Sequence, residues 1–166
     1  MGLSRTPITP DDAIHYIVEA FKAAFSLDDR HCWPTVDPMI PLGAIPPGGE
    51  MWMTVSLGDI EFGFDEADPD ALLAQTTVTV TAYTRFALDD MGHDDGLLLD
   101  ATRGCYPLLR QMVATIHGQE LLTDGAQPWC ASLPRCVFAS KPDYNQEHMV
   151  GWVSARFQIS WDWADA

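Results

Sequence analysis

The sequence predicts an α+β fold, in which an antiparallel or mixed β-sheet carries two main α-helices packed on one face. Two segments place apolar residues at helical spacing, and several others alternate apolar and polar residues as strands do. The order is helix, strands, helix, strands, and grouped strands favour an antiparallel or mixed sheet over the parallel sheet of βαβ units. With 166 residues, 47% of them hydrophobic, the chain can build one core, so we expect a single domain over residues 1–166.

Helical spacing predicts a first helix from about Asp11 to Ser26. Asp11 and Asp12 stand at its start, where carboxylates interact favourably with the helix dipole. The side opposite the apolar stripe carries polar and mixed charges instead of a basic array, so the stripe is a core face and not a membrane face. The stripe consists of Ile14, Ile17, Val18, Phe21 and Phe25.

Residues 27–50 contain five prolines and three glycines, which predicts an extended connector instead of a long helix or a central strand. Two short strands are expected after it, Met51 to Leu57 and Ile60 to Phe64. Gly58 and Asp59 separate them, in the manner of a hairpin or a bulge.

Two long strands are predicted from strict alternation, one within residues 76–86 ("TTVTVTAYTRF") and one from Val153 toward the C-terminus. Each has one apolar face for the core and one polar face that we expect to be exposed. Trp152 falls on the polar side, so it is the tryptophan expected at the surface. The expected polar positions are Thr77, Thr79, Thr81, Tyr83 and Arg85 on the first strand, and Ser154, Arg156, Gln158, Ser160 and Asp162 on the second.

A second helix is predicted from about Asp95 to His117, with Gly118 closing its C-terminal end. Pro107 lies inside this range, so we expect a kink or a start displaced toward Tyr106. A further strand follows in "PWCASLPRCVFAS", and the polar segment "KPDYNQEH" predicts the turn into the last strand.

Charge excludes some classes of partner. The chain has 9 Lys and Arg against 24 Asp and Glu, a net charge of −15, which opposes binding to nucleic-acid phosphates or anionic lipid. No apolar run approaches the roughly 18 residues of a membrane span, and the first residues do not resemble a signal peptide. We therefore expect no specific nucleic-acid binding, no membrane association and a reducing cytoplasm, with the four cysteines as free thiols.

The acidic segment "LDDMGHDDG" is the best candidate for metal chemistry, because its carboxylates could bind calcium or magnesium. Counted from Asp90, however, the glycine stands at position 7 and position 12 is Ala101, which does not fit an EF-hand loop. A solvated loop whose last aspartate, Asp95, caps the second helix explains the same residues. No metal site is predicted.

Signatures of catalysis are absent from the sequence. It has no GxSxG, no phosphate-binding GxxxxGK[ST] and no GxGxxG, and no two histidines are spaced as a helical zinc pair. His31 and Cys32 are adjacent in an extended segment, where they point to opposite sides, so His31 is badly placed to activate the thiol. We expect a protein that is not an enzyme, with no catalytic residue and no cofactor.

The strand edges favour self-association. The polar strand faces carry few lysines, which are the usual defence of an exposed edge, and the Pro-rich connector of residues 27–50 could reach over a neighbouring molecule. A homo-oligomer is therefore expected. The six tryptophans fit core packing, ligand stacking or contacts with a protein partner, and the sequence leaves these alternatives open.

The elements in this order resemble the tail terminator, or tail completion, proteins of long-tailed bacteriophages and prophages. The resemblance covers about residues 11 to 163: a first helix, a Pro-rich crossing, the strand "TTVTVTAYTRF", the helix "LLLDATRGCYPLLRQMVATI" and the closing strand "WVSARFQISWDW". It implies a hexameric ring that caps the tail tube and joins it to the head, with an acidic lumen through which DNA passes. The connector is longer than the resemblance needs.

The leading hypothesis is thus a structural virion protein, made in the host cytoplasm and then part of the tail, whose partners are its own copies and other tail or neck proteins. The alternatives are a small-ligand-binding or hydrolytic α+β domain with an aromatic-lined pocket, and an accessory protein bound to a basic partner. The residues expected at contacts are Trp33, Asp89, Asp90, Asp94, Asp95, Trp152, Arg156 and Gln158.

Overall fold

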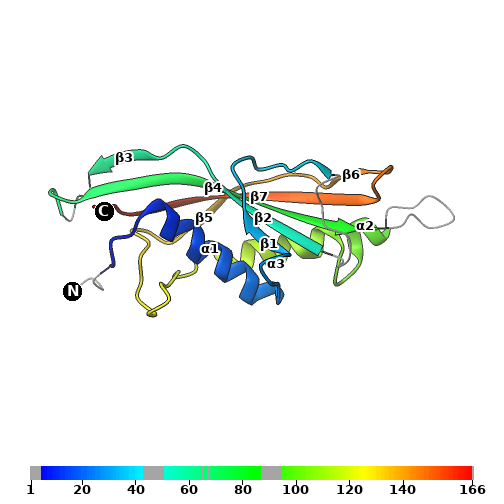
Figure 1. Ribbon diagram of the computed structural model, residues 1–166, viewed down its shortest axis with the longest axis horizontal. Helices are drawn as coiled ribbons and strands as arrows, with labels where there is room; N and C mark the ends of the chain where they lie inside the picture. The colour runs from blue at the N-terminus through cyan, green and yellow to red at the C-terminus, as the bar shows by residue number, and fades with distance from the viewer. Residues whose placement is uncertain (1–4, 43–50, 65, 67, 87–94, 166) are drawn as a thin grey trace.

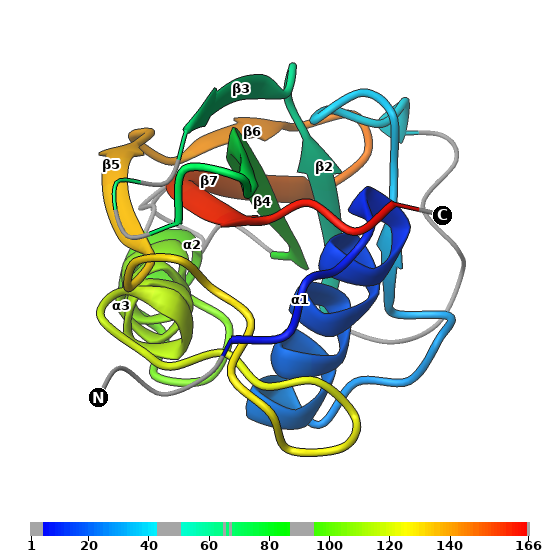
Figure 2. The same cartoon turned by 90° about the vertical axis from the view of Figure 1, so that its left-hand side faces the viewer.

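The computed structural model describes residues 5–42, 51–64, 66, 68–86 and 95–165; for Asp95 it describes the backbone only. It has the predicted α+β architecture, a mixed seven-stranded sheet with the two long helices α1 and α3 packed side by side on one of its faces (Figures 1 and 2). We call the face that carries the helices the inner face and the opposite one the outer face.

The strand order is β1-β2-β4-β7-β5, with β3 pairing to β4 and β6 to β7. The two long strands β4 and β7 pair antiparallel from Leu73 opposite Asp162 to Arg85 opposite Val150, and form the centre of the sheet. The short edge strand β1 pairs in parallel with β2, and the other pairings between the described strands are antiparallel. The strands are β1 Cys32–Pro34, β2 Met51–Leu57, β3 Glu61–Phe64, β4 Leu72–Arg85, β5 Arg135–Ala139, β6 Asp143–Asn145 and β7 Val150–Asp162.

Helix α1 spans Pro10–Phe25, within one residue of the prediction at each end. Thr9 and Asp12 form a capping box, in which the Asp12 N–H donates to Thr9 Oγ1 (3.3 Å) and the Thr9 N–H donates to Asp12 Oδ2 (3.4 Å). Pro10 occupies the first turn, where its missing N–H costs no helical hydrogen bond. Ser26 follows the last helical residue as the C-cap and adopts the left-handed conformation (φ 54°).

The prediction of one continuous second helix is wrong. It consists of α2 Asp95–Leu99 and α3 Cys105–Ile116, separated by a turn. The Asp100 carboxylate holds this turn by accepting hydrogen bonds from Thr102 N and Oγ1 and from Arg103 N, at 2.9–3.0 Å. Pro107 lies in the first turn of α3, where backbone N–H groups have no acceptor within the helix, so its missing N–H costs no hydrogen bond. The prediction that the helix starts near Tyr106 is confirmed.

The predicted break at Gly58 and Asp59 is a bulge and not a hairpin. Strands β2 and β3 both pair with the same edge of β4, with Leu57 opposite Val78 and Glu61 opposite Gln75. Three residues, 58–60, therefore face two on β4, which is the residue count of a bulge. The Thr76 hydroxyl donates to the carbonyl oxygens of Gly58 (3.0 Å) and Asp59 (2.9 Å) and fixes the bulge.

Two details near the C-terminus differ from the sequence prediction. The segment expected to be a plain polar turn contains β6, which pairs with the start of β7 from Asp143 opposite Trp152 to Asn145 opposite Val150. Strand β5 has an irregular register between Cys136 and Phe138. Bulges of this kind leave part of an edge strand unpaired and turn its side chains outward.

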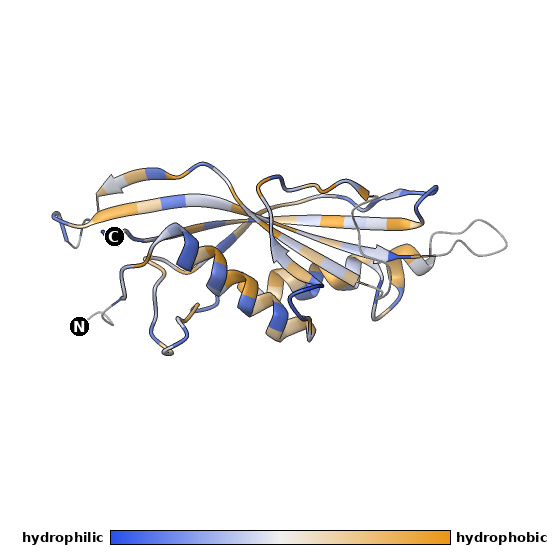
Figure 3. Ribbon diagram, viewed as in Figure 1, coloured by the Kyte–Doolittle hydropathy of each residue, from blue (hydrophilic) through white to orange (hydrophobic). Residues whose placement is uncertain are grey.

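The main core lies between the helices and the inner face of the sheet. Apolar residues alternate with polar ones along β4 and β7, as Figure 3 shows, and the apolar set points at the helices. The contributors are Val78, Val80 and Ala82 from β4, Val153, Ala155, Phe157 and Ile159 from β7, Ile17 and Phe21 from α1, and Met112 and Ile116 from α3.

Candidate functional site

The connector covers half of the outer face of the sheet. The Thr81 hydroxyl donates to the carbonyl oxygen of Pro38 (3.0 Å), and the backbone N–H of Ile40 donates to the Tyr83 hydroxyl oxygen (3.1 Å). These bonds hold the described part of the connector, residues 27–42, on its own sheet. The sequence had suggested a connector able to reach over a neighbouring molecule, and for this part that expectation is wrong.

A second, smaller core lies beneath the connector. Trp52, Tyr83 and Val150 are fully or almost fully buried there, with Trp33, Ile40, Leu42 and Trp152 packed against them. The prediction that Thr81 and Tyr83 are exposed is therefore wrong, and Trp152 is half-buried instead of exposed. Alternation correctly placed these side chains on the outer face, but it could not reveal what covers that face. The roles of Trp33 and Trp152 in contacts stay predictions.

Substituting Tyr83 with phenylalanine should lower the free energy of unfolding by about 1–3 kcal/mol, because the Ile40 N–H loses its acceptor in a buried place. The connector should also loosen, so limited proteolysis should cut within residues 34–42 faster than in the wild type. An unchanged cleavage rate would show that this hydrogen bond does not hold the connector.

The other half of the outer face is uncovered and polar. Gln75, Thr77 and Thr79 of β4 stand beside Gln158 and Arg156 of β7, with Thr77 opposite Gln158 and Thr79 opposite Arg156. The structure thus brings together two of the predicted contact residues, Arg156 and Gln158, on one exposed surface. We call this surface, formed by these five residues, the open face.

Strand β5 borders the open face with an arginine and an aromatic ring. The Arg135 guanidinium donates to Gln158 Oε1 (3.1 Å), and the Arg156 guanidinium lies 4.6 Å from the centre of the Phe138 ring. Both arginines are oriented by neighbours on the adjacent strand. Guanidinium groups held in one orientation are well suited to paired hydrogen bonds with carboxylates.

The open face is hollowed without being enclosed. A hollow of about 260 Å³ is lined by Asp59, Glu61 and Thr77 among others, and a second of about 370 Å³ by Leu133, Arg135 and neighbouring residues. They share Gln75 and Gln158. Such adjoining hollows on a sheet fit the irregular surface of a macromolecule better than a small ligand, which a protein normally buries on most sides.

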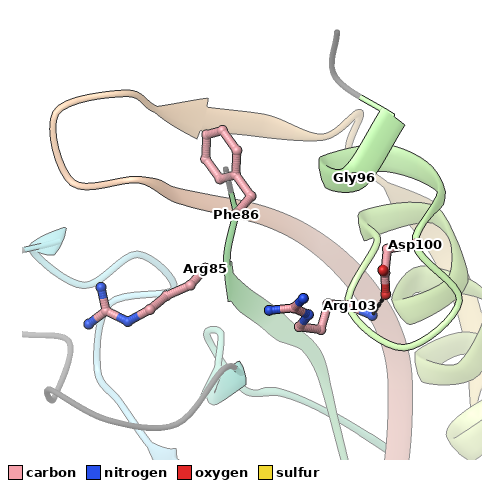
Figure 4. Close-up of a pocket in the computed structure, with 5 residues that line it drawn as sticks. All are labelled: Arg85, Phe86, Gly96, Asp100 and Arg103. Carbon is pink, nitrogen blue, oxygen red and sulfur yellow. Dashed lines mark hydrogen bonds between the residues drawn. The ribbon is translucent and has the colours of Figure 1, made fainter. Parts of the chain in front are cut away.

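A further hollow of about 360 Å³ lies at the end of β4 that faces α2 (Figure 4). Arg85, Phe86, Gly96, Asp100 and Arg103 line it. Hydrogen bonds from the Thr102 backbone, the Thr102 side chain and the Arg103 backbone lower the pKa of Asp100. This carboxylate therefore stays ionised and stabilises the turn between α2 and α3. Among the described residues of this lining, Phe86 is the one aromatic side chain, so they do not form the aromatic-lined pocket of the alternative hypothesis.

The acidic contact residues proposed from the sequence are not placed by the structure. Asp89, Asp90 and Asp94 lie outside the described residues, and Asp95 begins α2 with its side chain undescribed. Whether this segment binds a partner stays a prediction.

Cys32 lines a hollow between α1 and β1, together with Trp33, but its chemistry is that of a core thiol. Burial raises the pKa of Cys32 to about 12, and its sulfur lies 3.9 Å from the carbonyl oxygen of Val18. His31 Nδ1 is instead 2.6 Å from Asp28 Oδ1. The thiol is thus kept protonated, and the adjacent imidazole is engaged elsewhere.

Three of the six tryptophans, Trp52, Trp129 and Trp161, are completely buried and pack within the two cores. Within residues 5–42, 51–64, 66, 68–86 and 95–165, no three His, Cys, Asp or Glu side chains gather in a way that could hold a metal ion. In the same part of the chain, no helix has the length and apolar character needed to cross a membrane.

Sequence reasoning missed two exposed apolar patches. One lies on β3 and the start of β4, and the other on and just before β5; their members are Phe62, Phe64 and Leu72, and Leu133, Val137 and Phe138. A signal was present in "EFGFDE", where two phenylalanines share one side of a short strand beside an acidic loop. These side chains are exposed because the neighbouring strands and helices end before they could cover them, and the sequence does not show where those elements end in space.

Comparison with known proteins finds structural likenesses among solved chains but no family. No protein-family model and no curated protein matches the chain. Among solved structures, a chain described as "Virion of native gene transfer agent (GTA) particle" aligns over 90% of this chain and 91% of its own length, with a TM-score of 0.47 and 13% sequence identity. At this level the likeness does not transfer a function from that particle to this protein.

Proposed function

We propose that this protein is a structural subunit of a tailed phage or phage-like particle, a tail terminator or neck component that forms a homo-oligomeric ring on the tail tube. It works without catalysis and without a cofactor, in contact with its own copies and with other tail or neck proteins. The observation that carries the proposal is the unprotected end of the sheet, where the edge strands β3 and β5 both expose large apolar side chains.

The order and sizes of the elements support the same proposal through their resemblance to tail terminator proteins. The net charge of −15 is compatible with a ring through which DNA passes, since an acidic wall repels the phosphates and does not retain them. The rival, a ligand-binding or hydrolytic domain, has less support because the described hollows are open and the fully buried tryptophans fill cores.

The proposal is tested first on particles. Tailed particles purified from cells that carry this gene should contain the chain in a fixed, small copy number by quantitative mass spectrometry, and antibody against it should label one end of the tail. Its absence from particles whose tail tube and portal proteins are detected would refute the virion role.

Reversing the charge of Arg156 should impair assembly and leave the fold intact. Arg156 is exposed on the open face, so Arg156→Glu replaces an oriented cation by an anion in a protein that already repels its own copies. We expect self-association, followed by light scattering behind a sizing column, to need at least about tenfold more protein, equivalent to about 1.4 kcal/mol.

Arg110→Glu is the matched control, because Arg110 is also exposed but lies on α3, away from the open face. It makes the same change in net charge. If both variants weaken assembly equally, net charge and not the open face is responsible, and Arg156 leaves the proposed interface.

A further inference from the structure

We propose that copies of this chain join front to back, with the inner side of the β3 end of one copy packed on the outer side of the β5 end of the next. This inference rests on the proposed function, because it names the self-contact by which the ring would form. Two differently shaped and oppositely charged surfaces on one subunit carry it.

The first surface, here called the aromatic tip, consists of Phe62, Phe64 and Leu72. They are 52%, 81% and 41% exposed. Phe62 is opposite Ala74 and Phe64 is opposite Leu72, so pleating places them on the inner side, where Ala74 is fully buried. In Figure 1 this end of β4 projects beyond α1, which leaves the tip uncovered.

Packing from within the subunit covers only the base of the tip. The Phe62 ring meets Trp163 edge to face, with 5.0 Å between ring centroids. Phe64 lies two residues further along β3 than Phe62, and most of its side chain is exposed to water. A rigid ribbon that ends in an exposed phenylalanine has the form of an anchor for a partner surface.

The second surface, here called the β5 shelf, consists of Leu133, Val137 and Phe138. They are 59%, 49% and 47% exposed. Phe138 is opposite Arg156 of β7 and therefore lies on the outer side, and the irregular register between Cys136 and Phe138 leaves Val137 out of the regular pairing. Arg135 and Arg156 flank the shelf on the outer side, with the Arg156 guanidinium over the Phe138 ring.

The charges around the two surfaces are complementary. The sequence has no lysine or arginine between Arg30 and Arg85. The exposed Glu66, Asp68 and Asp70 lie in the loop that joins the two strands of the aromatic tip, and Glu61 lies on the opposite side of β3. Conversely, residues 125–142 contain no Asp or Glu but include Arg135 and Lys141. Copies that each carry −15 repel one another, so a stable self-contact must place scarce cations against carboxylates. The tip and the shelf do so.

Their placement makes the contact head to tail. Across the sheet, β3 neighbours β4, β4 neighbours β7 and β7 neighbours β5, so tip and shelf lie on opposite edges, three strand spacings or about 14 Å apart. They also belong to opposite faces. Each added copy therefore uses one surface and offers the other, and such association continues until a ring closes.

A mixing experiment tests this directly. Phe64→Asp removes the tip and Leu133→Asp removes the shelf, and each variant alone should stay monomeric at protein concentrations at least about tenfold above those at which the wild type assembles. Mixed in equal amounts, they retain one intact tip and one intact shelf. The mixture should therefore form a discrete heterodimer of twice 18.4 kDa and nothing larger, as measured by light scattering behind a sizing column.

Leu99→Asp is the matched control: Leu99 is 63% exposed, but it ends α2 at the opposite end of the molecule. This variant should assemble as the wild type does. All three variants should melt within about 3 °C of the wild type, since the replaced side chains are largely in water.

Three results would overturn the inference: single variants that assemble like the wild type, a mixture that stays monomeric while the wild type assembles, or a wild type that stays monomeric at every concentration. None of them decides the proposed function, which depends separately on whether purified particles contain the chain. A particle-bound protein with an intact but different self-contact would retain the function and refute the tip and shelf.

Discussion

Replacing Trp161 with alanine should lower the free energy of unfolding by about 3–5 kcal/mol. The side chain is fully buried at the end of β7, on the inner face, opposite Ala74. Its ring lies 6.3 Å from that of Trp129, and the two pack edge to face. Alanine leaves a cavity that neighbouring strands, fixed by their hydrogen bonds, cannot close. A loss of this size is a large fraction of the total stability of a domain.

Urea unfolding followed by circular dichroism measures the effect, with Trp163→Ala as the control. Trp163 is half-buried at the end of the same alternation, so its removal should cost clearly less, about 1–2 kcal/mol. Equal losses for the two variants would mean that the pair of Trp129 and Trp161 is not part of the tightly packed core.

Gly104→Ala should destabilise the protein by about 1–3 kcal/mol, although Gly104 has an ordinary φ of −64°. A Cβ at this position would lie 2.6 Å from the backbone N and O of Asp100 and 2.9 Å from the carbonyl carbon of Leu98. These are backbone atoms and cannot rotate away. The turn between α2 and α3, closed by the hydrogen bond from Gly104 N to Asp100 O (2.7 Å), must open to admit the methyl group.

Chemical denaturation again gives the magnitude, and amide hydrogen exchange locates it, since protection should fall in residues 100–108 first. Gly125→Ala is the control, because a Cβ there would meet its nearest atom, Thr123 Oγ1, at an ordinary 3.7 Å. That substitution should change stability by no more than about 0.5 kcal/mol. A neutral Gly104→Ala would show that the turn accommodates the methyl group by moving as a unit.

Local pattern was enough to find the main elements. The helix α1 and the long strands β4 and β7 were predicted because their apolar residues recur at 3.6 or 2 positions, a property that packing against any core enforces. The α+β class followed from their order. The start of α3 near Pro107 could also be predicted from the sequence, since proline is tolerated only in the first turn of a helix.

Coverage was decided by segments distant in sequence. Thr81, Tyr83 and Trp152 have the alternation of a surface face, yet the connector packs on them and buries them fully or in part. Phe62 and Phe64 are the opposite case: they are apolar and yet exposed. The sequence predicted their strand, but β3 lies beyond the helices that could have covered it. Of the predicted contact residues, Arg156 and Gln158 are brought together because β7 places them on one side.

The sequence by itself therefore determined which residues form helices and strands and which side of each strand they occupy. The tertiary structure alone decided which of those sides is covered. Periodicity is set by the local geometry of the backbone, whereas burial depends on whether a remote segment, such as residues 33–42, finds hydrogen-bond partners and apolar surface on the sheet.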